Sequence, residues 1–113
     1  MPSLPEFLDL KCRALHRSHE SVILSCGLDR VYGHQIFCGR RNPSREKLLQ
    51  LAFGLHLTVM ETQQLMLVGG KNVLYPRIPR DAAILFCIHR KMDFIEVQCL
   101  LSENGFPLLG EQK

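Results

Sequence analysis

Apolar residues recur every three or four positions along most of this chain, and no stretch alternates apolar and polar residues as a half-exposed strand does. Ser, Thr or Asp precedes most of the apolar stretches, and Gly follows several of them, which is typical of helix beginnings and ends. The pattern predicts an all-α fold with helices over residues 4–16, 19–26, 30–38, 45–54, 59–68, 80–91 and 94–103.

The second half of the chain repeats itself at an offset of 35 residues. Two copies are too few for a stacked repeat array, which usually needs about three or more. We therefore expect one compact unit, in which residues 71–113 form a C-terminal helical hairpin that packs on residues 1–70. The matched pairs are Leu51 and Phe86, Glu61 and Glu96, Gln63 and Gln98, Leu65 and Leu100, Gly70 and Gly105, and Leu74 and Leu109.

The helix expected over residues 80–91 is apolar on nearly every side, because residues 82–88 read AAILFCI. A small protein rarely buries a whole helix inside one chain, so this pattern predicts a subunit interface in addition to a core. We therefore expect a homodimer, and the same hairpin could hold a protein partner.

Composition narrows the class of protein. The chain has 113 residues, of which 46% are apolar and 22% charged, which fits one folded domain. No apolar run reaches the roughly 18 residues of a membrane span, and the first residues lack the basic start of a secretory signal. Five cysteines without a CxxC pair indicate free thiols in a reducing cytoplasm. The net charge of +3 lies entirely in residues 1–47, which modestly favours phosphate contact there.

Residues 18–44 read as two short helices, a tight turn and a basic loop. Gly27 stands where the chain leaves the first helix, Leu28 follows as an apolar plug, and Asp29 can cap the second helix. Gly39 ends that second helix, and GRRNPS follows it as a loop. A helix, a Gly turn and a second helix with outward polar side chains is a layout that suits the major groove of DNA.

This segment resembles the helix-turn-helix of the XRE family, which is also called lambda-repressor-like or Cro/C1-type. The resemblance covers residues 4–66 and implies a bundle of about five helices, here extended by the C-terminal hairpin. It also implies a prokaryotic transcriptional regulator that binds double-stranded DNA in a sequence-specific way, with residues 1–70 as the DNA-binding region. The matching residues are Gly27, Leu28, Asp29, Ile36, Gly39, Arg40, Arg41, Asn42, Pro43 and Ser44.

The resemblance also implies roles for individual side chains. An Arg can bind guanine O6 and N7 together, a Gln can pair with adenine, and Val can touch a thymine methyl group. Phosphate contacts would fix the orientation of the protein on the duplex. The residues expected to contact bases are Arg30, Val31, Tyr32 and Gln35. Those expected to contact the DNA backbone are His19, His34, Arg40, Arg41 and Arg45.

Two positions depart from the family pattern. Ile23 stands where the family usually has Ala, and Gly33 stands where it usually has a larger apolar residue. We expect Ile23 to fill the space that Gly33 leaves, which would conserve packing volume between the two helices.

Some residues also suggest functions other than DNA binding. Cys12 with His16, and His34 with Cys38, have i,i+4 spacing that could supply a Cys₂His₂ zinc site, but in the resembling fold the first helix packs away from the recognition helix. No nucleophile elbow, carboxylate pair or phosphate-binding loop is present, so we expect no enzyme, no metal ion and no cofactor. A protein-interaction module that keeps this shape without binding DNA is the alternative, and the weak charge, Asp29 and the apolar helix favour it.

Overall fold

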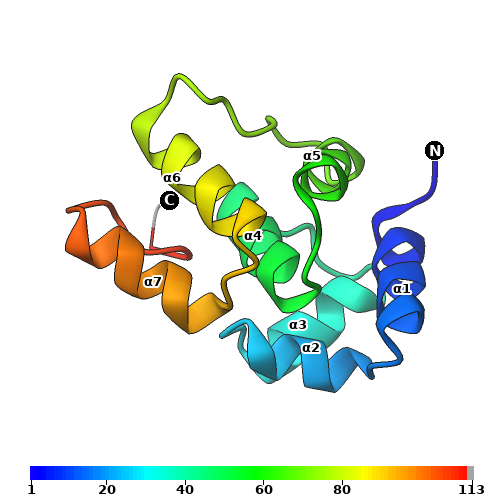
Figure 1. The fold of residues 1–113 in the computed structure, drawn as a ribbon. Coiled ribbons are helices and arrows are strands. Elements are labelled where there is room, and N and C mark those ends of the chain that lie inside the picture. Colours follow the sequence, from blue (N-terminus) through cyan, green and yellow to red (C-terminus); the bar gives the residue numbers. More distant parts are fainter. Residues whose placement is uncertain (112–113) are drawn as a thin grey trace.

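The computed structural model describes residues 1–111, and all regular secondary structure in that part of the chain is helical (Figure 1). The prediction of an all-α fold is confirmed. Residues 112–113, the end of the expected C-terminal region, lie outside the described residues. The helices are α1 (Leu4–Leu15), α2 (His19–Ser25), α3 (Arg30–Phe37), α4 (Arg45–Gly54), α5 (Val59–Val68), α6 (Pro79–His89) and α7 (Phe94–Glu103).

Most helices begin at a small polar residue whose side-chain oxygen accepts a hydrogen bond from a backbone N–H three residues later. This bond satisfies one of the donors that have no partner within the helix. In α5 and α7 the side chain of a glutamate, Glu61 or Glu96, also accepts a hydrogen bond from the backbone N–H of the capping residue. α6 instead begins with Pro79, whose missing N–H is harmless at a first helical position. The capping residues are Ser3, Ser18, Asp29, Ser44, Thr58 and Asp93.

The ends of four helices differ slightly from the sequence prediction. His16 and Lys91 adopt left-handed backbone angles, φ 56° and 59°, so the chain leaves α1 and α6 earlier than expected. Cys26 and Cys38 cap α2 and α3 rather than continue them. A glycine normally marks a left-handed stop, and neither His16 nor Lys91 gives that signal in the sequence.

Helix α4 runs through the middle of the molecule, with α1, α2, α3 and α5 on one side and α6 and α7 on the other (Figure 1). Nearly all of its length is buried, including Leu48, Leu49 and Leu51. A single core reaches from Leu8 in α1 to Val97 in α7, so both halves of the chain share it. None of the helices described in residues 1–111 is long and apolar enough to cross a membrane.

Helix α6 places most of its large apolar side chains in this core. Ile84, Cys87 and Ile88 are buried, whereas Phe86 is 48% exposed and lies beneath the guanidinium of Arg90. Much of the apolar surface that suggested a subunit interface is therefore used within the chain. The homodimer stays a prediction.

The repeat that the sequence shows is also present in the hydrogen bonds of the two hairpins, α4–α5 and α6–α7. The Gln63 side chain donates to the Leu74 carbonyl and accepts from the Leu74 N–H, both at 2.8 Å. Gln98, 35 residues later, does the same with Leu109 at 3.1 and 2.8 Å. The loop after each hairpin is therefore fixed to its second helix by the same two bonds.

The two hairpins exchange ion pairs at a site that we call the hairpin junction: Arg45, Glu46, Arg80 and Asp81. Arg45 of the first hairpin pairs with Asp81 of the second, with Nη2 and Oδ2 2.8 Å apart. Arg80 of the second hairpin pairs with Glu46 of the first, with Nη2 and Oε1 2.7 Å apart. The arginines also donate to carbonyl oxygens in the loop of their own hairpin, namely Asn72 and Val73 for Arg45, and Pro107 and Leu108 for Arg80.

The carboxylates of the junction complete the symmetry. Asp81 accepts from the Tyr75 N–H at 3.0 Å, and Glu46 accepts from the Gly110 N–H, again 35 residues later, at 3.1 Å. Residue i of one hairpin thus contacts residue j of the other, and j contacts i, as in a two-fold interface. Such an arrangement closes on itself, which supports the expectation of a compact pair of hairpins rather than an open array.

Candidate nucleic-acid interface

The turn between α2 and α3 requires glycine for two reasons. Gly27 has φ 73°, a left-handed angle that glycine adopts without steric cost. A Cβ atom at this position would also lie 2.5 Å from Cε2 of Phe94, the first residue of α7. Leu28 is buried as expected, and Asp29 accepts from the Tyr32 N–H at 3.0 Å. The C-terminal hairpin therefore packs directly against the turn between α2 and α3.

Helices α2 and α3 approach closely at Gly33. A Cβ atom on Gly33 would lie 2.5 Å from Cγ2 of Ile23, whose side chain is fully buried. The prediction that Ile23 fills the space left by Gly33 is confirmed. Val22, Ile23 and Cys26 from α2 and its cap, and Gly33 and Ile36 from α3, are all buried.

The outer face of α3 carries an open hollow on the surface of the protein. Val31 is 65% exposed there, so its methyl groups are accessible to a ligand. The side chains around Val31 are hydrogen-bonding or basic, apart from one thiol. The hollow is lined by Arg30, Val31, His34, Gln35, Cys38 and Arg40.

An acidic residue from α2 lies at one edge of this face. Arg30 donates from Nε to the carboxylate of Glu20, and His34 Nε2 lies 3.7 Å from the same carboxylate oxygen. The hydrogen bond from Arg30, and then its charge, lower the pKa of Glu20 below its usual value, and His34 adds to the effect. Glu20 is therefore a carboxylate at neutral pH.

The basic loop after α3 is tied to that helix. The backbone N–H groups of Arg40 and Arg41 both donate to the Gln35 carbonyl, at 2.9 and 3.3 Å. The Arg41 Nε donates to the Gln35 side chain at 3.2 Å, and its guanidinium lies 5.8 Å from the centre of the Tyr32 ring. Tyr32 is half-buried, and its ring lies beneath the Arg41 guanidinium.

Two residues expected at the DNA backbone already have protein partners. The His19 ring lies 3.0 Å from the Asp9 carboxylate and stacks on Phe37 with ring centres 4.4 Å apart. Arg45 belongs to the hairpin junction, where Asp81 and two carbonyls take up its guanidinium. The structure thus brings together Arg30, Val31, His34, Gln35 and Arg40, with Arg41 alongside them, and holds His19 and Arg45 elsewhere.

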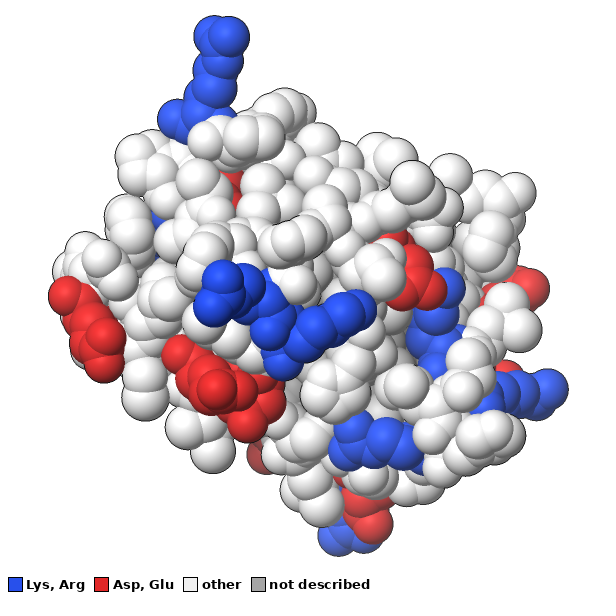
Figure 2. Space-filling model, viewed as in Figure 1, with Lys and Arg blue, Asp and Glu red and all other residues white. Residues whose placement is uncertain are grey.

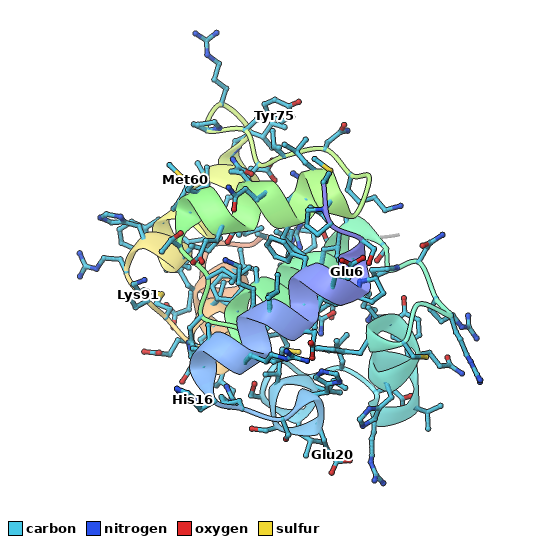
Figure 3. All side chains as sticks on the ribbon, turned by 90° about the vertical axis from the view of Figure 1, so that its right-hand side faces the viewer. Glu6, His16, Glu20, Met60, Tyr75 and Lys91 are labelled. Carbon is cyan, nitrogen blue, oxygen red and sulfur yellow. The ribbon has the colours of Figure 1, made fainter. Side chains whose placement is uncertain are left out.

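Charged residues of both signs are interspersed over the face seen in Figure 2. Glu20 lies at one end of the molecule, together with α2 and α3, whereas Met60 and Tyr75 lie at the opposite end (Figure 3). No large area of one charge sign is seen on the face in Figure 2.

The thiol and imidazole pairs that could have formed a zinc site are not joined. Cys12 is buried in α1, where desolvation raises the pKa of its thiol, whereas Cys38 is exposed at the end of α3. Within residues 1–111 no group of three or more His, Cys, Asp or Glu side chains is placed to hold a metal ion.

Sequence reasoning missed Glu20 and Asp9, the acidic partners of Arg30 and His19. Each lies ten residues before its partner, a spacing that becomes a contact only once the crossing of neighbouring helices is known. The junction had a better signal, because an Arg followed by an acidic residue occurs at 45–46 and again at 80–81. That repeat marks Arg45 and Arg80 as equivalent positions of the two hairpins.

Comparisons with protein-family models, curated proteins and solved structures found no match to this chain. The resemblance to the lambda-repressor-like family stays a prediction from the motif residues.

Proposed function

We propose that this chain binds double-stranded DNA, with the outer face of α3 in the major groove and the loop after it on the phosphate backbone. The observation that carries the proposal is the outer face of α3, where Arg30, Val31 and Gln35 line one hollow. Two arginines, Arg40 and Arg41, stand in the loop directly after this helix. A helix with such side chains fits the width of the major groove. Together with the resemblance of the motif, this makes a sequence-specific transcriptional regulator the function that we favour.

The proposed contacts are fewer than the sequence implied. Arg30, Val31 and Gln35 would contact bases, whereas His34, Arg40 and Arg41 would contact phosphates or support that contact. Tyr32 would act through Arg41, whose guanidinium it underlies. His19 and Arg45 are left out, because Asp9 and Asp81 engage them.

A second copy of the chain would supply a second recognition helix. Two such helices read half-sites about 34 Å apart, on successive turns of the duplex. A dimer on DNA is therefore part of the proposal, and the oligomeric state can be measured in the same binding experiment.

The test is binding of the purified chain to a fluorescent pool of random-sequence duplexes over a series of salt concentrations. With three phosphate contacts per chain, log K should fall against log salt with a slope of about −3 for one bound chain and about −5 for a bound dimer. The double variant Arg40→Ala/Arg41→Ala should reduce that slope by about two for each bound chain. Selection from the bound pool would then give the preferred sequence.

Arg77 provides the control, because it is exposed in the loop between α5 and α6, near Tyr75 at the opposite end of the molecule (Figure 3). Arg77→Ala removes one positive charge from a site away from α3 and should leave the slope unchanged. No binding by a folded protein at low salt, or an equal loss in Arg77→Ala, would count against DNA binding through α3.

A second candidate function is docking to a protein. An apolar groove lies between the N-terminus and α5, lined by Phe7, Leu67 and Val68 among others, and Leu67 is exposed there. Binding of this kind depends on apolar contact and should be nearly insensitive to salt. The salt series therefore separates the two functions.

A further inference from the structure

Glu20 and Arg30 join the two helices of the proposed DNA-binding motif at its outer edge. Glu20 belongs to the first turn of α2, and Arg30 is the first residue of α3. Arg30 uses its Nε–H for Glu20, and no hydrogen bond within residues 1–111 takes up its Nη1 or Nη2 groups. The side chain is 69% exposed, so these two groups face solvent beside the hollow on α3.

The position of this bond restricts what Arg30 can recognise. A guanidinium can bind two acceptors side-on through Nε and one Nη, or end-on through both Nη groups. The bond to Glu20 uses Nε and leaves only the end-on pair. That pair matches O6 and N7 of guanine, the two acceptors that guanine presents in the major groove.

Glu20 also brings a negative charge close to where phosphates would lie. If this position contributed only to affinity, a carboxylate there would be unfavourable, since its charge opposes binding to every duplex. An acidic residue at this edge is useful if it lowers binding to non-specific sequences and orients Arg30 for the specific one. His34, 3.7 Å from the same oxygen, helps to keep the carboxylate in place.

We propose that Glu20 is a positioning residue that holds Arg30 end-on and thereby sets a preference for guanine at the base pair that Arg30 reaches. The inference rests on the proposed function, because it concerns the same face of α3. Its chemistry is separate from phosphate contact, so it can fail while DNA binding stands.

The experiment uses two variants that both remove the charge. Glu20→Ala removes the acceptor for the Arg30 Nε–H, whereas Glu20→Gln keeps an oxygen that can accept it. Affinities would be measured for the duplex selected by the wild-type chain, for that duplex with each guanine replaced in turn, and for a non-specific duplex. Glu103→Ala, which removes an exposed carboxylate at the end of α7, is the matched control.

Both Glu20 variants should bind the non-specific duplex more tightly, by about two- to fivefold, because a repulsive surface charge is gone. Only Glu20→Ala should lose preference for one guanine, by about tenfold, which is within the range of one bidentate contact. In an Arg30→Ala background the difference between the two variants should vanish.

Equal preference for guanine in Glu20→Ala and Glu20→Gln, whether both keep it or both lose it, would overturn the inference. Tighter binding of all duplexes by the same factor would also overturn it, because Glu20 would then act through its charge alone. Failure of the wild-type chain to bind any duplex at low salt would instead overturn the proposed function.

Discussion

The arginine–carboxylate pairs of the hairpin junction and of the α3 edge have different surroundings. At the hairpin junction the side chains of Arg80 and Glu46 are 9% and 8% exposed. At the edge of α3 the side chains of Arg30 and Glu20 are 69% and 43% exposed. The same chemical pair is therefore part of the scaffold where it is buried, and remains accessible to a ligand where it is exposed.

Burial decides the difference because an ion removed from water needs a partner for every charge and donor. Arg80 meets this need with both oxygens of Glu46 and two loop carbonyls. Arg30 needs only water or a ligand on its Nη groups, so these groups can bind DNA while its Nε–H stays bonded to Glu20. The same substitution should therefore have very different effects on stability at the two sites.

The largest effect is expected from removal of a buried arginine. Arg80→Ala leaves Glu46 buried without its partner and should lower the free energy of unfolding by about 3–5 kcal/mol. Arg30→Ala should leave the urea midpoint close to that of the wild-type chain, since exposed pairs contribute little. Urea unfolding followed by circular dichroism measures both. Equal midpoints for the two variants would show that burial does not separate the sites.

A second effect concerns what holds α3 in position if its exposed ion pair does not. The close packing of Ile23 on Gly33 predicts that Gly33→Ala destabilises the fold by about 1–3 kcal/mol, because the buried Ile23 side chain has no room to move. In an Ile23→Ala background the same change should stabilise by up to about 1 kcal/mol, since alanine favours a helix interior over glycine.

Urea unfolding of the four proteins in this double-mutant cycle gives the coupling between the two positions. Additive effects would mean that α3 is positioned by contacts other than the one with Ile23.

The smallest effect is a difference in thiol reactivity between the scaffold and the interface. Burial raises the pKa of the Cys26 thiol to about 11, so about one molecule in a thousand carries the reactive thiolate at pH 8. Cys12 and Cys87 are also buried, whereas Cys38 and Cys99 are exposed. We expect an alkylating reagent to modify Cys38 and Cys99 first, as measured by mass spectrometry of the peptides.

Addition of DNA should slow the alkylation of Cys38, which lines the hollow on α3, and leave Cys99 on α7 unchanged. Equal protection of both thiols would indicate that DNA covers a face other than the proposed one.

The sequence was sufficient for the existence of the helices and, except in α6, for their first residues. Capping residues such as Asp29 and Thr58 act within three residues of themselves, so the local pattern contains the whole interaction. The space shared by Ile23 and Gly33 was also predictable, because both deviate from one family pattern in opposite directions.

Contacts between distant elements were not predictable in the same way. The exchange of Arg45 and Arg80 between hairpins depends on their relative orientation, and a repeat offset alone does not give that orientation. The pair Leu51 and Phe86 shows the limit, since one side chain is fully buried and the other half-exposed despite the matched positions. Outward positions on α3 were predicted from the family pattern, but the partners of Arg30 and His19 came from neighbouring helices.

The reciprocal contacts of the hairpin junction join two parts of one polypeptide, with only residues 69–78 between α5 and α6. A short tether of this kind keeps the two faces at an effective concentration of about millimolar. Dilution cannot separate them, in contrast to an interface between two molecules. The scaffold that presents α3 should thus be fully assembled at the nanomolar concentrations where binding to DNA is measured, whatever the association state of the chain.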